Sequence, residues 1–178
     1  MESPDIHLII GGARSGKSAL AEMLAKESGM PVIYIATAQV YDEEFGERIS
    51  RHQERRPKEW ETVEQPFGLA TTLKQHAGIN RCLIVDCLTL WLAQCICPDC
   101  APPEGVDWNR ERIDFLEILP KQPGRIVLVS NEVGMGIVPL GEINRRFQDE
   151  QGKLNQAVAT IATQVTFVAA GLPIKLKG

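Results

Sequence analysis

A glycine-rich run near the start of the chain constrains the fold more than any other feature. Residues 11–18 read Gly-Gly-Ala-Arg-Ser-Gly-Lys-Ser, which fits the pattern G-x-x-x-x-G-K-[ST]. The apolar segment His7–Ile10 precedes the run and is predicted to be a buried strand, and Ser18–Ser28 follows with apolar residues at helical spacing. The run therefore lies in the strand–turn–helix context that a phosphate-binding loop requires.

The residue types in this run indicate a nucleoside triphosphate, ATP or GTP, as the ligand. Glycines let successive backbone N–H groups converge on phosphate oxygens, and the following helix adds partial positive charge. Lys17 is expected to bridge the β and γ phosphates and Ser18 to ligate Mg²⁺. The residues assigned to the nucleotide here are Gly11, Gly12, Ala13, Arg14, Ser15, Gly16, Lys17 and Ser18.

Short apolar runs alternate with longer stretches of helical pattern along the rest of the chain, which favours a parallel sheet. We therefore predict an α/β, P-loop NTPase-like three-layer fold with a mostly parallel central sheet, built as one domain over residues 1–178. Further strands are predicted at Val32–Ala36, Cys82–Val85, Ile126–Ser130 and Val165–Ala169, and a helix at Trp108–Leu119.

Composition excludes several classes of function. The 178 residues are 44% hydrophobic and 24% charged, which is typical of a globular protein. Their net charge of -4 does not favour a protein that binds nucleic acid by neutralising phosphates. The chain has no apolar run of the roughly 18 residues that a membrane span needs and no N-terminal targeting pattern, so we expect a cytoplasmic protein.

Asp86 is the candidate second magnesium ligand. It ends the apolar run Leu83–Val85, so its carboxylate is expected at the carboxyl end of a buried strand, where a P-loop protein needs this group. The alternative is that Asp86 caps a helix beginning at Leu88, since aspartate is a common N-cap residue.

His52 is the candidate nucleophile, although a lone histidine on a charged helix is most often a surface residue. The charged segment Asp42–Arg56 has a helical pattern in which Arg48, His52 and either Arg55 or Arg56 fall on one stripe. Such a cationic stripe suits a triphosphate. Neighbouring cations would also lower the pKa of the imidazole, which keeps it neutral and nucleophilic near pH 7.

Other residues leave two interpretations open. Asn131, Glu132 and Gly134 follow a predicted strand and are expected near a ligand, or they form a turn in which Asn131 caps a helix. The close spacing of Cys95, Cys97 and Cys100 permits a metal site, but a structural zinc site usually has four ligands in two pairs, and free thiols are the default interpretation. Trp60 and Trp91 are assigned to the core.

Segments spread over nearly the whole chain, from Leu8 to Lys177, carry a family resemblance. They are GGARSGKS (residues 11–18), YIATA (34–38), RISRHQERRP (48–57), WETVEQP (60–66), DCLTLWL (86–92), VSNEVGMGIVP (129–139) and RRFQDEQGKLNQ (145–156). In this order they resemble the bifunctional adenosylcobinamide kinases and adenosylcobinamide-phosphate guanylyltransferases of cobalamin biosynthesis.

The resemblance implies a two-step activity. ATP or GTP phosphorylates the aminopropanol hydroxyl of adenosylcobinamide, and GTP then donates GMP to adenosylcobinamide phosphate, which gives adenosylcobinamide-GDP and pyrophosphate. In the family the GMP is carried by a histidine, and the matching residue here is His52. Some members have a second histidine where this chain has Arg51. The family also implies a homo-oligomer, with a trimer favoured.

The resemblance extends the set of nucleotide contacts and leaves two rival functions. The contacts that it adds are Ala36, Thr37, Ala38, Gln53, Glu54, Arg55, Arg56, Glu64 and Asp86.

One rival function is that of a simple small-molecule kinase in which His52 has no chemical role. The other is a nucleotide-driven switch that turns over no small substrate.

Overall fold

A seven-stranded sheet forms the centre of the computed structural model, which describes residues 4–39, 56–100 and 102–178. The strand order is β3-β2-β4-β5-β1-β6-β7, and every pairing is parallel except that of β7 with β6. The predicted α/β class with a mostly parallel sheet is confirmed. The strands are β1 (Asp5–Gly11), β2 (Val32–Ala36), β3 (Glu61–Glu64), β4 (Cys82–Asp86), β5 (Arg125–Asn131), β6 (Gln164–Ala169) and β7 (Leu172–Lys177).

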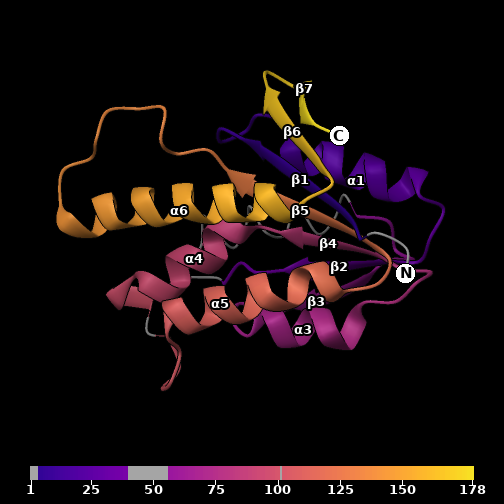
Figure 1. Cartoon of the computed structure of the whole chain (residues 1–178), viewed down its shortest axis with the longest axis horizontal. Coiled ribbons are helices and arrows are strands. Elements are labelled where there is room, and N and C mark those ends of the chain that lie inside the picture. Colours follow the sequence, from indigo (N-terminus) through magenta and orange to yellow (C-terminus); the bar gives the residue numbers. More distant parts are fainter. Residues whose placement is uncertain (1–3, 40–55, 101) are drawn as a thin grey trace.

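Helices cover both faces of the sheet, as Figure 1 shows. On one face α1 packs against β1, β4 and β5, and on the other α4 and α6 contact the sheet while α3 and α5 pack beside them. The described helices are α1 (Lys17–Glu27), α3 (Leu69–His76), α4 (Leu88–Ile96), α5 (Trp108–Ile118) and α6 (Glu142–Ile161), with short 3-10 turns at Pro98–Cys100 and Leu119–Lys121. Among these residues no helix is both long and apolar enough to cross a bilayer.

The alternation of side chains along β2 shows how the sheet separates two apolar clusters. Ile33 and Ile35 face the cluster beneath α3–α6, whereas Val32, Tyr34 and Ala36 face the cluster beneath α1. All five residues are buried, as expected for a central strand of a parallel sheet. Because β4 pairs with β2 in register, Tyr34 and Asp86 lie on the same face of the sheet as α1.

Gly124 illustrates how the turn before β5 depends on a missing side chain. Its φ is +82°, and a Cβ there would lie 2.1 Å from the carbonyl oxygen of Gly78. We expect Gly124→Ala to lower the free energy of unfolding by about 2 to 4 kcal/mol, from a strained φ and a backbone clash. Gly29→Ala is the matched control, since Gly29 has a φ of +66° with no atom within 4 Å of the added Cβ. Denaturant unfolding of both variants measures the difference, and equal losses would contradict a role for the clash.

His7 makes stability depend on pH. Its side chain is 5% exposed on β1, and burial, with Arg125 nearby, lowers the pKa of the imidazole below its usual value of about 6.5. The unfolded chain therefore binds the proton first as the pH falls. The contribution of His7 to the free energy of unfolding should be constant well above pH 6.5 and fall below about pH 6.5, by at most about 1.4 kcal/mol per pH unit.

Chemical denaturation from pH 8 to pH 5 measures this dependence, with His7→Gln as the comparison. His7 Nε2 lies 2.8 Å from Thr166 Oγ1, a contact that a glutamine amide can replace. The difference in free energy between the two proteins should change with pH only in the acidic range. A difference that stays constant from pH 8 to pH 5 would contradict the assignment.

Candidate functional site

The glycine-rich run forms a tight turn between β1 and α1, as predicted. Gly16 lies just before the helix with a φ of +102°, and Arg14 also has a positive φ of 54°. A Cβ on Gly11 would lie 2.3 Å from the carbonyl oxygen of Val168, so the close approach of β1 to the end of β6 excludes a side chain there. The β6–β7 turn also supports this loop, because Gly171 N donates to Ser15 O at 2.8 Å.

Lys17 folds back into the turn. Its Nζ donates to Gly12 O at 2.5 Å and to Ser15 Oγ at 3.5 Å, and the residue is only 7% exposed. Burial lowers the pKa of the Lys17 ammonium, while Cys87 and Asp86 act in the opposite direction. Among the described residues, the hydrogen bonds of this positive charge go to the backbone of the turn and to a hydroxyl, so the turn suits an anionic ligand.

Asp86 ends β4 on the same face of the sheet as α1, close enough to Lys17 to raise its pKa. Its Oδ2 accepts a hydrogen bond from the hydroxyl of Tyr34. The helix-capping alternative is wrong, because the N-cap of α4 is Cys87, whose Sγ accepts from Leu90 N at 3.4 Å. A carboxylate and the Ser18 hydroxyl are both hard oxygen donors of the kind that Mg²⁺ prefers, so these residues fit the ion.

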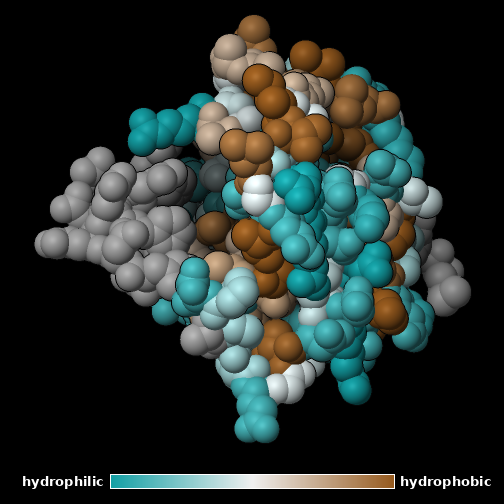
Figure 2. Space-filling view, turned by 90° about the vertical axis from the view of Figure 1, so that its left-hand side faces the viewer, coloured by the Kyte–Doolittle hydropathy of each residue, from teal (hydrophilic) through white to brown (hydrophobic). Residues whose placement is uncertain are grey.

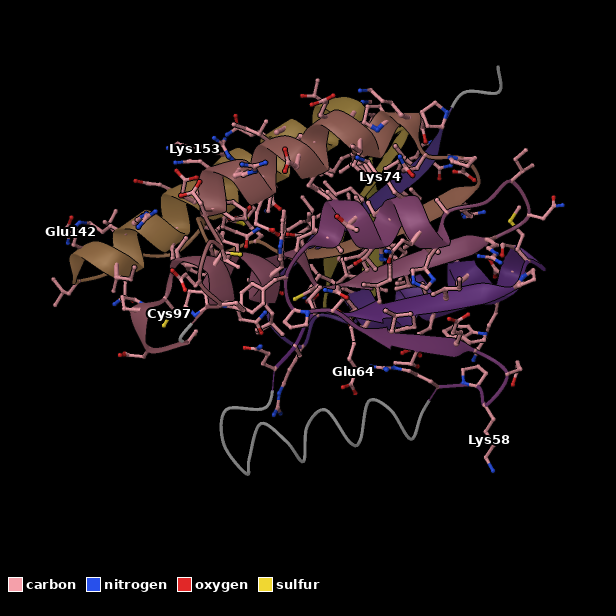
Figure 3. The ribbon with its side chains drawn as sticks, turned by 90° about the horizontal axis from the view of Figure 1, so that it is seen from below. Lys58, Glu64, Lys74, Cys97, Glu142 and Lys153 are labelled. Carbon is pink, nitrogen blue, oxygen red and sulfur yellow. The ribbon has the colours of Figure 1, made fainter. Side chains whose placement is uncertain are left out.

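Three of the predicted nucleotide contacts lie side by side on neighbouring strands, at the carboxyl ends of those strands. Glu64 of β3 pairs with Ala36 of β2, which pairs with Asp86 of β4. Glu64 is exposed on the edge strand, and Figure 3 shows its side chain directed away from the sheet. Open parallel sheets bind ligands at this edge, beside the point where the strand order reverses around β1.

Thr37 connects the ends of β2 and β4 rather than presenting a free hydroxyl. The side chain is fully buried, and its Oγ1 donates to Cys87 O at 2.7 Å and accepts from Cys87 N at 2.8 Å. Its backbone N donates to Asp86 O at 3.1 Å. A role in holding the Asp86–Cys87 corner follows from these bonds, whereas its contact with a nucleotide stays a prediction, as does that of Ala38.

Gln94 is a positioning residue that the sequence analysis missed. It is 1% exposed on α4, and its Nε2 donates to Thr37 O at 2.8 Å and to Pro66 O at 3.3 Å. Its Oε1 accepts from Gln39 N at 2.9 Å. One amide thus joins the loops that follow β2 and β3. The available signal was a glutamine inside the otherwise apolar helix sequence LTLWLAQCI.

Arg56 lies over the ring of Tyr34, with its guanidinium carbon 3.7 Å from the ring centroid. Its Nε and Nη1 are buried and have no hydrogen-bond partner in the described part of the chain. The other predicted residues of this segment are outside the described residues, so their positions stay predictions. These residues are His52, Gln53, Glu54 and Arg55, together with Arg48 and Arg51.

The loop after β5 is joined to the phosphate-binding turn. Glu132 N donates to Gly11 O at 2.9 Å, and the Glu132 carboxylate accepts from Gly134 N. Asn131 does not cap a helix: it ends β5, its carbonyl accepts from Asn155 Nδ2 at 3.0 Å, and α6 begins after Gly141. The capping alternative is therefore wrong.

The same loop carries an apolar surface. Figure 2 views the face from which the loop projects, and hydrophobic atoms gather in its upper part. Met135 is 80% exposed, Ile137 96% and Leu140 91%, and Val138 is also exposed. Isolated exposed apolar residues are ordinary, but a consecutive group of this kind is typical of a binding surface.

Cys95 and Cys97, two of the three clustered cysteines, are free thiols in this structure. Cys95 is buried, Cys97 and Cys100 are partly buried, and the residues that the structure describes contain no group of three side chains able to hold a metal. Burial, with Glu111 and Asp107 nearby, raises the pKa of Cys95 to about 12. Trp91 is fully buried, its Nε1 donates to Glu111 at 3.0 Å, and it belongs to the core as predicted. Trp60 is partly buried and packs against the cluster beneath α1.

A family model described as cobinamide kinase / cobinamide phosphate guanyltransferase matches residues 7–176. The chain is 57% identical over 171 residues to the bifunctional adenosylcobalamin biosynthesis protein CobP of Pseudomonas aeruginosa, which covers 96% of each protein. It is 35% identical over 179 residues to the bifunctional adenosylcobalamin biosynthesis protein CobU of Escherichia coli, which covers 96% of this chain and 98% of that protein.

Solved structures share the fold at low sequence identity. The flagellar accessory protein FlaH of Methanocaldococcus jannaschii aligns with a TM-score of 0.52 at 15% identity, over 99% of this chain and 80% of that one. The RadB recombinase aligns with a TM-score of 0.52 at 15% identity, over 93% and 74%. These likenesses support the P-loop NTPase-like architecture and carry no information about substrate.

Proposed function

Because the chain belongs to the cobinamide kinase / cobinamide phosphate guanyltransferase family of enzymes, we propose that it phosphorylates adenosylcobinamide with ATP or GTP and then transfers GMP from GTP to the product. The observation that carries the proposal is the Gly11–Ser18 turn with buried Lys17 inside a family match over 7–176. We place this activity in the cytoplasm.

In the kinase step the substrate hydroxyl attacks the γ phosphorus, its proton is lost to solvent or to a base, and the bond to the β–γ bridging oxygen breaks. The turn residues bind the phosphates through backbone N–H groups, and Lys17 balances their charge. Mg²⁺ supplies further charge neutralisation when bound. Ser18 and Asp86 would hold it, in keeping with their oxygen donors on the α1 side of the sheet.

In the guanylyltransferase step His52 is the nucleophile. Its neutral imidazole nitrogen forms a bond to the α phosphorus of GTP while the bond to the pyrophosphate oxygen breaks, and the imidazole proton is lost to solvent or to a base. A phosphate oxygen of adenosylcobinamide phosphate then attacks the same phosphorus, and the P–N bond breaks as the departing imidazole takes up a proton, which regenerates neutral His52. In each of the two displacements a neutral imidazole nitrogen is the nucleophile or the leaving group, so the acceptor phosphate meets the GMP group only after pyrophosphate has left.

The remaining predicted contacts complete the proposed nucleotide site. Arg56 is the most informative, because its buried Nε and Nη1, which have no partner among the residues that the structure describes, can donate to a phosphate oxygen or a guanine carbonyl. The proposed contacts are Gly11, Gly12, Ala13, Arg14, Ser15, Gly16, Lys17, Ser18, Ala36, Thr37, Ala38, Gln53, Glu54, Arg55, Arg56, Glu64 and Asp86.

We also expect a homo-oligomer, with a trimer favoured by the resemblance. Apart from the loop after β5, the edge strand β7 exposes Leu172, Ile174 and Leu176, which alternate along the strand and so share one face. A contact between subunits would remove such side chains from water. Light scattering that finds a fully active monomer would refute this expectation.

Product analysis distinguishes the proposed function from its rivals. The protein is incubated with adenosylcobinamide, Mg²⁺ and GTP, and the corrinoids are identified by liquid chromatography and mass spectrometry. The proposed enzyme forms first the phosphate and then the GDP derivative. A simple kinase stops at the phosphate, and a nucleotide-driven switch forms neither product.

A further inference from the structure

Tyr34 lies between the Asp86 carboxylate and the Arg56 guanidinium, two groups of the proposed site, although it is not itself a proposed nucleotide or metal contact. It is the central residue of β2, is 1% exposed, and faces α1. Its hydroxyl donates to Asp86 Oδ2, and the guanidinium of Arg56 lies over its ring at 3.7 Å. A single buried side chain therefore contacts both a proposed magnesium ligand and a proposed nucleotide contact.

The bond to Asp86 restricts how the carboxylate can turn. A carboxylate at the end of a strand rotates about its Cα–Cβ and Cβ–Cγ bonds unless a partner fixes it. With Oδ2 occupied by the Tyr34 hydroxyl, the carboxylate has one defined orientation, and Oδ1 is the oxygen left for a cation. A carboxylate oxygen can only accept a hydrogen bond, so the Tyr34 hydroxyl is the donor in this contact.

The contact with Arg56 is made by the aromatic ring of Tyr34. An arginine over an aromatic ring is stabilised by about 0.5 to 2 kcal/mol, more when water is excluded. The stacked guanidinium keeps Nε and Nη1 buried and without a partner among the described residues, a costly arrangement that an anionic ligand would relieve. The charged groups that act on Tyr34 are Asp86, Arg56 and Glu22 of α1.

We propose that Tyr34 is a positioning residue for both transfer steps, which fixes the magnesium-binding orientation of Asp86 through its hydroxyl and the nucleotide-binding orientation of Arg56 through its ring. The proposal rests on the proposed function, since it assigns Asp86 to Mg²⁺ and Arg56 to the nucleotide. Arg56 is four residues beyond His52 in the sequence.

Tyr34→Phe separates the two contacts, because it removes the hydroxyl and keeps the ring. We expect the affinity for Mn²⁺, used in place of Mg²⁺ and measured by electron paramagnetic resonance with a non-hydrolysable GTP analogue bound, to fall roughly tenfold to a hundredfold. The Mg²⁺ concentration for half-maximal kinase activity should rise by the same factor. Affinity for the GTP analogue without metal should change less than twofold, because Arg56 keeps its aromatic contact.

Two further variants complete the test. Arg56→Gln should weaken metal-free binding of the GTP analogue and leave the affinity for Mn²⁺ within twofold of wild type. Thr72→Val is the matched control: it removes another buried hydroxyl, which donates to Gly68 O at 3.2 Å on α3, on the other face of the sheet, and should change neither measurement.

The outcome for Tyr34→Phe decides the proposal. A Mn²⁺ affinity within twofold of wild type would overturn it, whether or not activity falls, because a purely structural role can lower activity without altering metal binding. The Mn²⁺ measurement does not involve a corrinoid. A wild-type protein that fails to phosphorylate adenosylcobinamide would refute the proposed function, while the metal and nucleotide titrations would still test Tyr34.

Discussion

Replacing His52 with alanine is expected to abolish covalent guanylylation while phosphorylation of adenosylcobinamide continues. The variant lacks the only nitrogen nucleophile in the proposed relay, whereas the Gly11–Ser18 turn, which is proposed to bind the γ phosphate, is unchanged. GTP labelled at the α phosphate should leave acid-labile label on the wild-type protein and none on His52→Ala. The variant should accumulate adenosylcobinamide phosphate without forming adenosylcobinamide-GDP.

The other two histidines of the chain provide matched controls. His7 is buried four residues before Gly11, roughly 13 Å back along β1, and its Nε2 contacts Thr166. His76 ends α3 on the opposite face of the sheet from α1. His7→Gln and His76→Ala should therefore retain full labelling. Intact-protein mass spectrometry with peptide mapping identifies the modified residue, and GMP found on any residue other than His52 would end the proposed relay.

The elements that were predicted correctly are those whose sequence carries a strong local pattern. Val32–Ala36 is a continuous run of buried residues, and its predicted and observed boundaries agree. Two strands were missed for physical reasons. β3 has the sequence ETVE and is largely exposed at the sheet edge, and β7 contains a proline and two lysines and pairs only with β6. Edge strands with such residues lack the apolar run that marks a buried strand.

The site could be predicted only where its chemistry is local in sequence. The Gly11–Ser18 turn carries its own signature, and Asp86 is assigned to the site because it follows an apolar strand. By contrast, Thr37 contacts Cys87 across 50 residues, and Gln94 reaches Thr37 across 57. These bonds arise because β2 and β4 are neighbours in the sheet although β3 lies between them in sequence. No spacing rule within one sequence reports that adjacency, so the partner of Asp86, Tyr34, was also missed.

Removing the charge of Lys17 is expected to impair both transfer steps, in contrast to the selective effect at His52. Lys17→Met keeps much of the length of the side chain but removes the ammonium that donates to Gly12 O. Loss of one preorganised donor to a transferring phosphate typically lowers kcat by about 10² to 10³. We expect losses of this size both in phosphorylation of adenosylcobinamide and in formation of guanylylated protein, each measured as an initial rate with labelled GTP.

The loss of activity in Lys17→Met should come from weaker phosphate binding and slower transfer rather than from unfolding of the protein. Gly12 O loses a donor in Lys17→Met, which costs about 1 to 3 kcal/mol, and thermal unfolding checks that the variant remains folded. Lys26→Ala is the matched control on the same helix, since Lys26 lies in the last turn of α1 with its Nζ 5.9 Å from the ring centroid of Trp60, away from the glycine-rich turn. It should retain both activities. If Lys17→Met stays folded and guanylylates itself at the wild-type rate, pyrophosphate leaves without the help of this turn, and the two steps do not share one phosphate site.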